Sequence, residues 1–524
     1  MAVSDDRKYT GQQVYNLLEG VKGKTLGEVD KSHQFARTAT KPKITGIAGD
    51  VVEQSVFGYN RDSKQECDIE IDGVLTELKT TGVRIPKDEL NRVAGKTGKA
   101  YNIHLHAKEG ISITGVTFEP DIQRDFITSH FWEKSQHLLI VFYEYKSYVK
   151  VPASAFANFP IVDYCYNSFS DDERNKLEND WEKVRDYLEK VYDEFKNTNE
   201  RNKHLVGFTH ILRPNLMLIE LVPGFKRKAT GGYQKPRYRL KRTFVDYLVQ
   251  GHFNKKRSES EIKLKESFSS FEQLDERCHK LTSLYKGKTL NELMSIFGIK
   301  EWSKDTTARC VLRMFDSDGK RLNQISDFTK TGIIAKTIAI TTTDKRTEDM
   351  KLFHVDFEEW TDRDVDFEDS VIYNYFSEHS FLFPIFREDR RIVGSIANKQ
   401  ELAYDATHAI TFEGFKRISF DDTFIEKEVR RTWENSRNLI FRNELVWNYE
   451  YNKSGEKKIN KSGSYMGAPN LPKSSQYNVF FRGGGLISNE TTRTEVVNGV
   501  KMLPQYIWLR GSYIADKLKE TPYI

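Results

Sequence analysis

The sequence predicts a mixed α/β fold, with α+β character, arranged as two successive domains. Segments with helical periodicity alternate with short apolar runs typical of buried strands. The length of 524 residues exceeds what a single hydrophobic core usually serves. The octapeptide KGKTLGEV at 22–29 also returns as KGKTLNEL at 286–293. Such an internal echo indicates a duplicated unit of about 250 residues.

The composition is that of a globular chain with no membrane segment. Aromatic residues make up 12% and charged residues 30%, which argues against bulk disorder. The formal net charge of +5 is too small to identify a nucleic-acid partner by itself. The four cysteines form no CxxC motif, and the N-terminus lacks an apolar signal region, so a reducing cytoplasm is expected. The longest apolar run, LLIVFY at 138–143, is too short to cross a bilayer.

The first half contains well-marked helices and strands. TGIAGDVVEQSVFG at 45–58 predicts a helix, because its apolar residues recur at helical spacing. ISITGVTF at 111–118 and HLLIVFYEY at 137–145 predict strands, the second of them buried. The segment 171–195 predicts a long amphipathic helix with an acidic first turn. A mixed central sheet flanked by helices accommodates this order of elements.

A polar, charge-rich stretch divides the two predicted domains. We expect a first domain at 1–250, a linker at 251–272 and a second domain at 273–524. A fainter echo supports the duplication: GVLTELKTTGV at 73–83 resembles DFTKTGIIAKTIAI at 327–340. When Lys79 is aligned with Lys336, Ile334 stands opposite Glu77.

The repeated GKT does not belong to a nucleotide-binding P-loop. Such a loop needs a glycine five residues before the glycine of GK, and Leu18 and Thr282 stand there. An NTPase function is therefore excluded on this motif.

The stretch CDIEIDGVLTELKTTG at 67–82 carries the candidate chemistry. Asp72-Gly73 predicts a two-residue hairpin turn, which pairs residue 71 with 74, 69 with 76 and 68 with 77. Asp68 then lies opposite Glu77, and Lys79 shares the face of Glu77. The two carboxylates suit Mg²⁺, and Lys79 would orient or activate the water that attacks phosphorus. The alternative is a solvated amphipathic hairpin without catalytic function.

An acid followed by E-x-K on the next strand resembles the active site of PD-(D/E)xK nucleases. The preceding helix with Glu53, and FWEKSQHLLIVFYEY with Lys134, resemble the MutH family of endonucleases. The resemblance implies that Glu53 reaches the metal through water and that Lys134 contacts the scissile phosphate. In the family the acid lies seven residues before the glutamate, where this chain has Glu70. A hairpin lengthened by two residues makes Asp68 the ligand instead, with Glu70 and Asp72 as the alternatives.

The duplicated layout is similar to that of the MutH-related type II restriction endonucleases, which carry one active and one degenerate MutH-like domain and typically cut at GATC. Both halves end in similar segments: HILRPN with QKPRYRLKRTFVDYL, and VFFRGGG with LPQYIWLRGSYIADKL. The resemblance implies two tandem MutH-like domains of the PD-(D/E)xK type. Ile334 cannot coordinate Mg²⁺, so the second domain is expected not to cut and to be a DNA-binding or regulatory domain. The resemblance implies that it binds a second copy of the target site and activates the first domain.

Basic residues concentrate before and within the predicted linker. Residues 226–257 contain eleven Lys or Arg and a single acid, Asp246. Such an excess favours phosphate contacts, although a solvated charged surface is the ordinary alternative. Arginine can also bond guanine through two hydrogen bonds, which makes Arg213, Arg237, Arg482 and Arg510 candidates for base reading. The predicted DNA-binding set is Arg213, Lys235, Arg237, Arg239, Lys241, Arg242, Arg482 and Arg510.

Together these features predict a Mg²⁺-dependent type II restriction endonuclease that cuts double-stranded DNA at a short palindrome, with GATC expected from the resemblance. Asp68 and Glu77 would bind the metal. One active site per chain implies a homodimer on DNA or two successive nicks. A cognate DNA methyltransferase would act on the same site. Two alternatives are a MutH-type mismatch-repair nicking endonuclease, against which the duplication weighs, and an inactive sequence-specific DNA-binding protein, against which the intact Asp68, Glu77 and Lys79 weigh.

Overall fold

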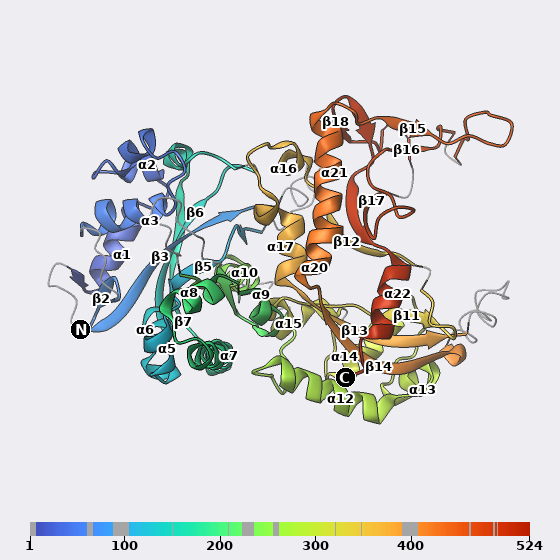
Figure 1. The fold of residues 1–524 in the computed structure, drawn as a ribbon, viewed down its shortest axis with the longest axis horizontal. Helices are drawn as coiled ribbons and strands as arrows, with labels where there is room; N and C mark the ends of the chain where they lie inside the picture. Colours follow the sequence, from blue (N-terminus) through green and yellow to red (C-terminus); the bar gives the residue numbers. More distant parts are fainter. Residues whose placement is uncertain are drawn as a thin grey trace. The chain divides into compact units, whose positions relative to one another are not determined.

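The chain forms two compact units with mixed α/β structure (Figure 1). The structure is a computed structural model, and it describes residues 7–59, 66–86, 104–148, 150–207, 209–222, 235–254, 261–319, 321–346, 348–389, 407–460, 463–485, 488–489 and 491–524. The first unit comprises Met1–Ser147, Val151–Leu274 and Asn323–Ile333; the second comprises Tyr148–Lys150, Asp275–Leu322 and Ile334–Ile524. The predicted combination of mixed sheets and helices is confirmed in both units.

A six-stranded mixed sheet forms the centre of the first unit. Its strand order is β1-β2-β3-β6-β7, and β4 pairs with β3. The pairs β1/β2 and β3/β6 are parallel, whereas β2/β3, β3/β4 and β6/β7 are antiparallel. The bounds are β1 Lys8–Tyr9, β2 Ile69–Ile71, β3 Val74–Arg84, β4 His106–Ala107, β6 His137–Glu144 and β7 Ile161–Ser168.

Short helices cover one face of this sheet. Figure 1 shows α1 (Gly11–Glu19), α2 (Leu26–Val29) and α3 (Ile47–Val51) gathered beside β3 and β6. The α3 helix continues as a π-helical turn, η3 (Val52–Phe57), so the helix predicted at 45–58 is confirmed. Leu18, Leu26 and Val51 pack with Leu78 and Val141 in one buried cluster. Alternate residues of β6 face this cluster, which places the remaining residues on the opposite face.

The opposite face of the sheet is covered by α10 (Arg242–Phe253). The ring of Phe142 in β6 lies 5.2 Å from that of Phe253 and 5.4 Å from that of His252. A separate antiparallel sheet has the order β5-β9-β8, with bounds Ile111–Gly115, Arg237–Leu240 and Ile219–Val222. The strand predicted at 111–118 is therefore shorter than expected, because Phe118 already begins α5.

The long helix α7 (Asp171–Glu194) confirms the helix predicted at 171–195. Its N-terminus has a capping box in which Ser170 and Glu173 satisfy each other's backbone N–H groups. The remaining helices of the unit are η2 Gln34–Ala39, α5 Phe118–Ile122, η4 Phe126–Thr128, α6 His130–Ser135, η5 Ala153–Asn158, α8 Thr198–Gly207, α9 Thr209–Leu212, η6 Arg213–Asn215 and α15 Ser326–Thr331. Within the predicted linker 251–272, Leu264 and Phe268 are buried and α12 begins at Phe271.

Two larger sheets form the second unit, one mixed and one antiparallel. The first has the order β10-β13-β11, with β14 paired to β13; β11 is parallel to β13, and β14 is antiparallel to it. The second is antiparallel, in the order β12-β20-β17. The strands are β10 Ile333–Ala335, β11 Ile338–Thr341, β12 Met350–His354, β13 Ser380–Glu388, β14 Ile410–Ser419, β17 Val479–Gly483 and β20 Gln505–Leu509, with hairpins β15 Trp447–Tyr449/β16 Gly467–Pro469 and β18 Glu495–Val497/β19 Val500–Met502.

Helices pack on these sheets around a core rich in aromatic residues, including Trp360, Phe381 and Trp433. The helices are α12 Phe271–Tyr285, α13 Leu290–Ile296, α14 Thr306–Met314, η7 Leu322–Gln324, α16 Phe357–Thr361, η8 Phe367–Asp369, α17 Val371–Glu378, α20 Asp422–Phe424, η9 Ile425–Val429, α21 Arg430–Phe441 and α22 Gly511–Glu520.

The repeated octapeptide adopts the same conformation in both units. Thr25 and Thr289 each cap a short helix, through capping boxes completed by Glu28 and Glu292. Gly23 and Gly287 both have positive φ angles, +83° and +80°. Their N–H groups donate to the carbonyls of Ile161 and Phe412, at 2.7 and 2.8 Å. The repeat therefore docks a capped helix onto an edge strand, β7 in one unit and β14 in the other.

Candidate active site

The hairpin that carries the predicted chemistry has the predicted register. Ile71 pairs with Val74, and Ile69 pairs with Thr76. Asp72 and Gly73 form the turn with φ angles of +48° and +83°, as a two-residue turn with two left-handed residues requires. Asp68 stands one residue before β2, so the same register continued by one pair places it opposite Glu77.

Two lysines converge on the Glu77 carboxylate. Glu77 is buried, with 2% of its surface exposed, and its Oε1 accepts from Lys79 Nζ at 2.7 Å. Lys134 Nζ lies 3.1 Å from each carboxylate oxygen. Lys134 reaches this point because α6 ends just before β6, whose Leu138 pairs with Glu77 across the parallel ladder. Sequence spacing alone does not reveal this contact.

Asp68 lies beside this cluster. Its Oδ2 accepts from the Leu78 backbone N–H at 2.9 Å. Burial raises the pKa of Asp68 to about 6, and the charge of Glu77 acts in the same direction. Burial alone would lower the pKa of Lys79, but the charges of Glu77 and Asp68 outweigh it and the pKa is raised. The site therefore combines two mutually repelling acids with the Lys79 ammonium group, which remains charged.

Glu53 also belongs to this neighbourhood. A Cβ atom added at Gly49 would lie 3.8 Å from Glu53 Oε1 and 3.7 Å from Thr80 Oγ1, so the Glu53 carboxylate approaches β3. Its charge also contributes to the raised pKa of Lys79. Of the alternatives to Asp68, Asp72 lies in the turn and accepts from the Gly11 N–H at 3.0 Å. Glu70 lies within β2, paired with Leu75. The contacts with Leu78 and the lysine cluster favour Asp68.

Two further residues near the acids were not expected from the sequence. Burial, and then the charges of Asp68 and Glu53, raise the pKa of Tyr59, and the Arg7 guanidinium lies 4.6 Å from its ring. Burial and the charge of Glu77 raise the pKa of Cys67 to about 12, which keeps its thiol protonated. Tyr59 directly follows the VFG that ends the Glu53 helix, and Cys67 precedes Asp68. In the sequence, only this closeness to Glu53 and Asp68 could have indicated that Tyr59 and Cys67 lie near the site.

The donor set fits a magnesium ion that completes its shell with water and a substrate phosphate. Mg²⁺ takes one or two protein carboxylates in such sites. Asp68 and Glu77 would supply these oxygens, and burial followed by the charge of Glu77 is what raises the pKa of Asp68. Within the described ranges no group of three or more His, Cys, Asp or Glu side chains could enclose a metal. The fit is therefore to a substrate-completed site rather than to a closed protein cage.

The predicted DNA-binding residues of the first unit differ in accessibility. Lys235 and Arg237 are exposed. Arg239 shares the face of Arg237 on β9, and its Nε donates to Glu220 Oε1 at 2.7 Å. Lys241 is 3% exposed and donates to the Leu216 carbonyl at 2.5 Å, so it stabilises the fold rather than presenting a charge to DNA. Arg213 begins η6 and Arg242 begins α10. The basic residues at 226–228 and 255–257 lie outside the described residues.

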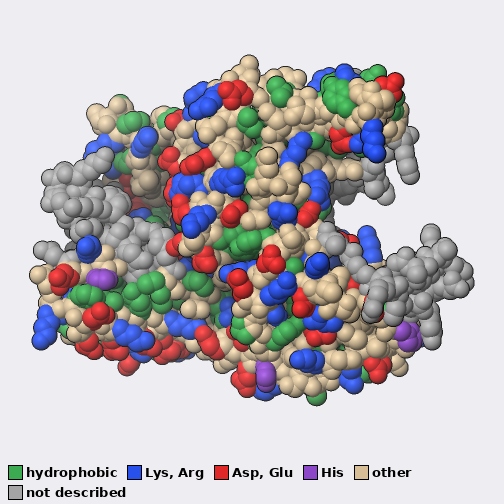
Figure 2. Space-filling model, turned by 45° about the vertical axis from the view of Figure 1, so that its right-hand side comes forward, with side chains coloured by type: hydrophobic (Ala, Val, Ile, Leu, Met, Phe, Trp, Pro, Cys, Tyr) green, Lys and Arg blue, Asp and Glu red, His purple; other side chains and the backbone are tan. Residues whose placement is uncertain are grey.

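The predicted residues of the second unit lie around β17, β20 and β10. Arg482 donates to Asp349 Oδ2 at 2.5 Å, and Arg510 occupies the N-cap position of α22 without a capping bond from its side chain. Lys336 Nζ donates to the Lys351 carbonyl at 2.7 Å. Burial, and then the charges of Arg346 and Lys351, lower the pKa of Lys336 to about 8. In the face shown in Figure 2, basic and acidic side chains are interspersed rather than separated into one uninterrupted patch.

Asp327 belongs to the segment 327–340 that echoes the hairpin in sequence. It lies in α15 and pairs with Lys176 at 3.2 Å and Lys330 at 3.4 Å. Asp172 completes this network through both lysines. Since a buried lysine needs a compensating acid, the network gives Asp327 a structural function in the first unit.

Comparisons with known proteins agree with this site. The family model described as DNA mismatch repair enzyme MutH matches residues 57–180, a range that includes Asp68, Glu77, Lys79 and Lys134. The chain is also 23% identical over 457 residues to the type II restriction enzyme Sau3AI of Staphylococcus aureus; the match covers 82% of this chain and 79% of that protein.

These matches confirm the predicted resemblance to MutH-related restriction endonucleases, and they support a type II site-specific endonuclease as the class of enzyme. Among the helices that the structure describes, none is long and apolar enough to span a bilayer.

Proposed function

We propose that the protein is a Mg²⁺-dependent type II restriction endonuclease that hydrolyses phosphodiesters of double-stranded DNA at a short palindrome, with GATC as the expected site. The observation that carries the proposal is the convergence of Lys79 and Lys134 on the buried Glu77, beside Asp68. Burying a carboxylate costs free energy, so a hairpin without catalytic function is expected to leave its charged side chains in solvent. The resemblance to MutH and the similarity to Sau3AI support the substrate class.

Each of the five side chains has its own proposed role in hydrolysis. Asp68 and Glu77 would hold Mg²⁺, which when bound neutralises charge at the phosphate and the leaving oxygen. Lys79 orients the water whose oxygen attacks phosphorus as the bond to the leaving oxygen breaks. Lys134 is placed to contact the scissile phosphate once it no longer neutralises Glu77. Glu53 acts from the adjoining helix, where a bridging water links its carboxylate to the site.

The proposed architecture is two tandem MutH-like domains, 1–250 and 273–524, joined by a linker at 251–272. The identically capped octapeptides support the duplication. So do the antiparallel sheets β5-β9-β8 and β12-β20-β17, which have the same strand order relative to the chain. In the parallel pairs β3/β6 and β11/β13, the second strand is also preceded by a helix capped by a serine, Ser129 before α6 and Ser370 before α17.

The second domain is proposed to bind DNA without cutting. Ile334 replaces the metal-binding glutamate. Lys134 stands three residues before β6, and the corresponding position before β13 is Ser377. The lysine that remains, Lys336, has Arg346 and Lys351 as the charged groups that act on it. Three carboxylates, those of Glu348, Asp349 and Glu388, act on Arg346, but none is among the groups that shift the pKa of Lys336. A lysine in these surroundings suits a DNA phosphate rather than a metal.

The proposal extends to the partners and the compartment. A palindrome presents two strands and each chain has one cutting site, so two chains would assemble on DNA or cut in succession. We further propose that the enzyme acts in the cytoplasm, where a methyltransferase modifying the same site would protect the cell's own DNA.

A digest of unmethylated plasmid with Mg²⁺ tests the proposal, with an EDTA control and the Glu77→Ala variant in parallel. Discrete fragments from the intact chain alone, with one sequence at their ends, are expected. Accumulation of nicked circles would favour the mismatch-repair nickase. A gel shift without any cutting, by the intact chain as well as by Glu77→Ala, would favour the inactive DNA-binding protein.

A further inference from the structure

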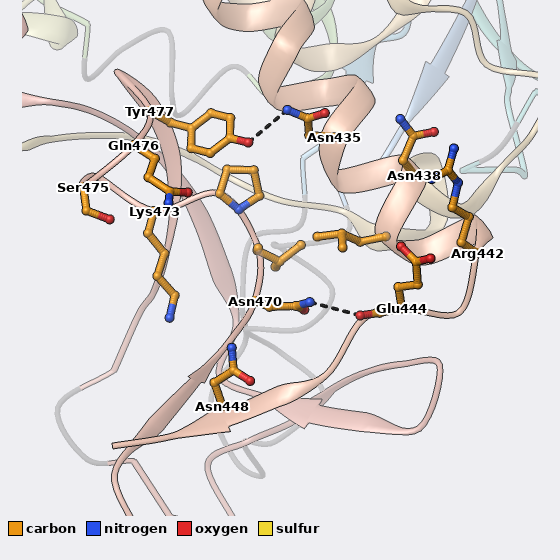
Figure 3. Close-up of a pocket in the computed structure, with 13 residues that line it drawn as sticks. Asn435, Asn438, Arg442, Glu444, Asn448, Asn470, Lys473, Ser475, Gln476 and Tyr477 are labelled. Carbon is orange, nitrogen blue, oxygen red and sulfur yellow. Dashed lines mark hydrogen bonds between the residues drawn. The ribbon is translucent and has the colours of Figure 1, made fainter. Parts of the chain in front are cut away.

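A polar pocket of about 510 Å³ opens on the second unit, away from the residues considered so far. It lies between the C-terminal end of α21, the loop 470–477 and β15 (Figure 3). Leu439, Leu471 and Pro472 supply its apolar surface, and Leu471 is only 2% exposed. The volume is typical of a site for one small organic group.

The walls of the pocket are held by internal hydrogen bonds. Asn435 Nδ2 donates to the Tyr477 hydroxyl at 2.9 Å, and Asn470 Nδ2 donates to the Glu444 carbonyl at 3.0 Å (Figure 3). Asn470 Oδ1 also accepts from the Val446 N–H at 2.9 Å. These bonds fix the loop against α21 and the start of β15, so the pocket is preformed.

Unlike the residues of the walls, the side chains at the mouth of the pocket are exposed and not held by internal hydrogen bonds within the described ranges. Asn438, Asn448 and Gln476 carry exposed carboxamides that make no hydrogen bond with any residue in the described ranges. The cations Arg442 and Lys473 likewise have no ion-pair partner among the described residues. Figure 3 shows Asn438 and Arg442 on the helix, opposite Lys473 and Gln476 on the loop.

This combination matches the chemistry of a nucleotide. A carboxamide offers a donor and an acceptor side by side, as the edge of a nucleobase does. The apolar surface can pack against the flat ring, and two cations against the single acid Glu444 leave a positive balance for a phosphate. A concave pocket cannot enter a DNA groove, so the nucleotide it accepts must project from its strand or be free.

We propose that this pocket binds one nucleotide unit, with the phosphate at Arg442 and Lys473 and the base edge at Asn438, Asn448 and Gln476. The inference rests on the proposed function, in which the second domain binds DNA. It adds a specific site and the class of ligand. The bound nucleotide unit can belong to a DNA strand or be a free nucleotide. Two arms of one experiment distinguish these two ligands.

The first arm measures binding of a fluorescent duplex bearing the cleaved sequence, by anisotropy, in a Glu77→Ala background that prevents cutting. The double variant Arg442→Gln/Lys473→Gln is expected to bind about tenfold more weakly. Its plot of log affinity against log salt should be shallower by about 0.9 for each phosphate that the variant no longer binds. The matched control is Lys280→Gln/Lys519→Gln, which removes two exposed lysines of the same unit outside the pocket and should bind like the parent.

The amide variant Asn438→Ala/Gln476→Ala tests the base contact. We expect about tenfold weaker binding with an unchanged salt slope, whereas Asn291→Ala, an exposed amide on α13, should have no effect. The second arm titrates the same proteins with deoxynucleoside monophosphates by calorimetry. If the pocket variants lose only this binding, the pocket takes free nucleotides.

Unchanged binding of both DNA and monophosphates by both pocket variants would overturn the proposal. This failure is distinguishable from that of the proposed function, because plasmid cutting by the intact chain is measured separately. A chain that cuts DNA while its pocket variants bind normally disproves only the pocket. A chain that neither cuts nor binds DNA disproves the proposed function, and the monophosphate titration then still decides the pocket.

Discussion

Replacement of Lys134 by methionine tests how the active site is balanced before metal and DNA bind. Lys134 is 12% exposed and bonds both oxygens of Glu77 at 3.1 Å. Methionine retains most of the apolar stem but removes the ammonium group. Glu77 then keeps Lys79 as its close cationic partner, at 2.7 Å.

The expected cost follows from the burial of Glu77. Removing the only partner of a buried ion pair costs about 3–5 kcal/mol. Since Lys79 remains, we expect the free energy of unfolding of the first unit to fall by about 2 kcal/mol. Mg²⁺ should recover more stability in Lys134→Met than in the parent, because the ion replaces the missing positive charge and adds its binding free energy.

Urea unfolding followed by tryptophan fluorescence, with and without Mg²⁺, measures both effects. Lys280→Met is the control, because it breaks an exposed pair with Glu276 and should cost no more than about 0.5 kcal/mol. The reasoning is refuted if Lys134→Met is as stable as this control. It is also refuted if Mg²⁺ stabilises the parent and Lys134→Met equally.

Three further predictions concern the folded framework. Burial would raise the pKa of Asp172, but its bonds to Lys176 and Lys330 lower the pKa from 3.8 to about 2. Asp172→Asn should therefore lower the free energy of unfolding by about 2 kcal/mol at neutral pH. Urea unfolding at a series of pH values should show this difference vanish as the pH falls from about 4 to 2. Gly73→Ala should cost about 1 kcal/mol, since Gly73 has a φ of +83°; Val74→Ala on the exposed start of β3 is the control for the same assay. Thr25→Ala and Thr289→Ala should each cost about 1 kcal/mol, because each threonine caps a helix, and serine at either position should restore the stability.

The sequence predicted the parts of the site that depend on local geometry. The Asp72-Gly73 turn fixes the register of the hairpin, so the relation of Asp68 to Glu77 followed from counting residues. The buried strand β6 and the long helix α7 were also found at nearly their full length, because each has an uninterrupted pattern.

Contacts between distant segments could not be read from the sequence in this way. Lys134 was expected at the phosphate, and its bond to Glu77 depends on how α6 meets the parallel pair β3/β6. Lys241 was expected at DNA, yet it is buried against the Leu216 carbonyl. Asp327 begins the segment that echoes the hairpin, and its place in α15, paired with Lys176, could not be read from that echo. A charged side chain has the same appearance in sequence whether its partner is solvent, DNA or another segment of the fold.

The central claim, that the first unit alone performs cleavage, is tested most directly by comparing the two lysines aligned by the internal repeat. Single-turnover cleavage of an unmethylated duplex is measured with Mg²⁺ and saturating enzyme for Lys79→Met and Lys336→Met. We predict a fall of about 10²-fold or more for Lys79→Met. Lys336→Met should cut at the parental rate once the DNA is saturated. An equal fall in both variants, or normal cutting by Lys79→Met, would contradict the claim.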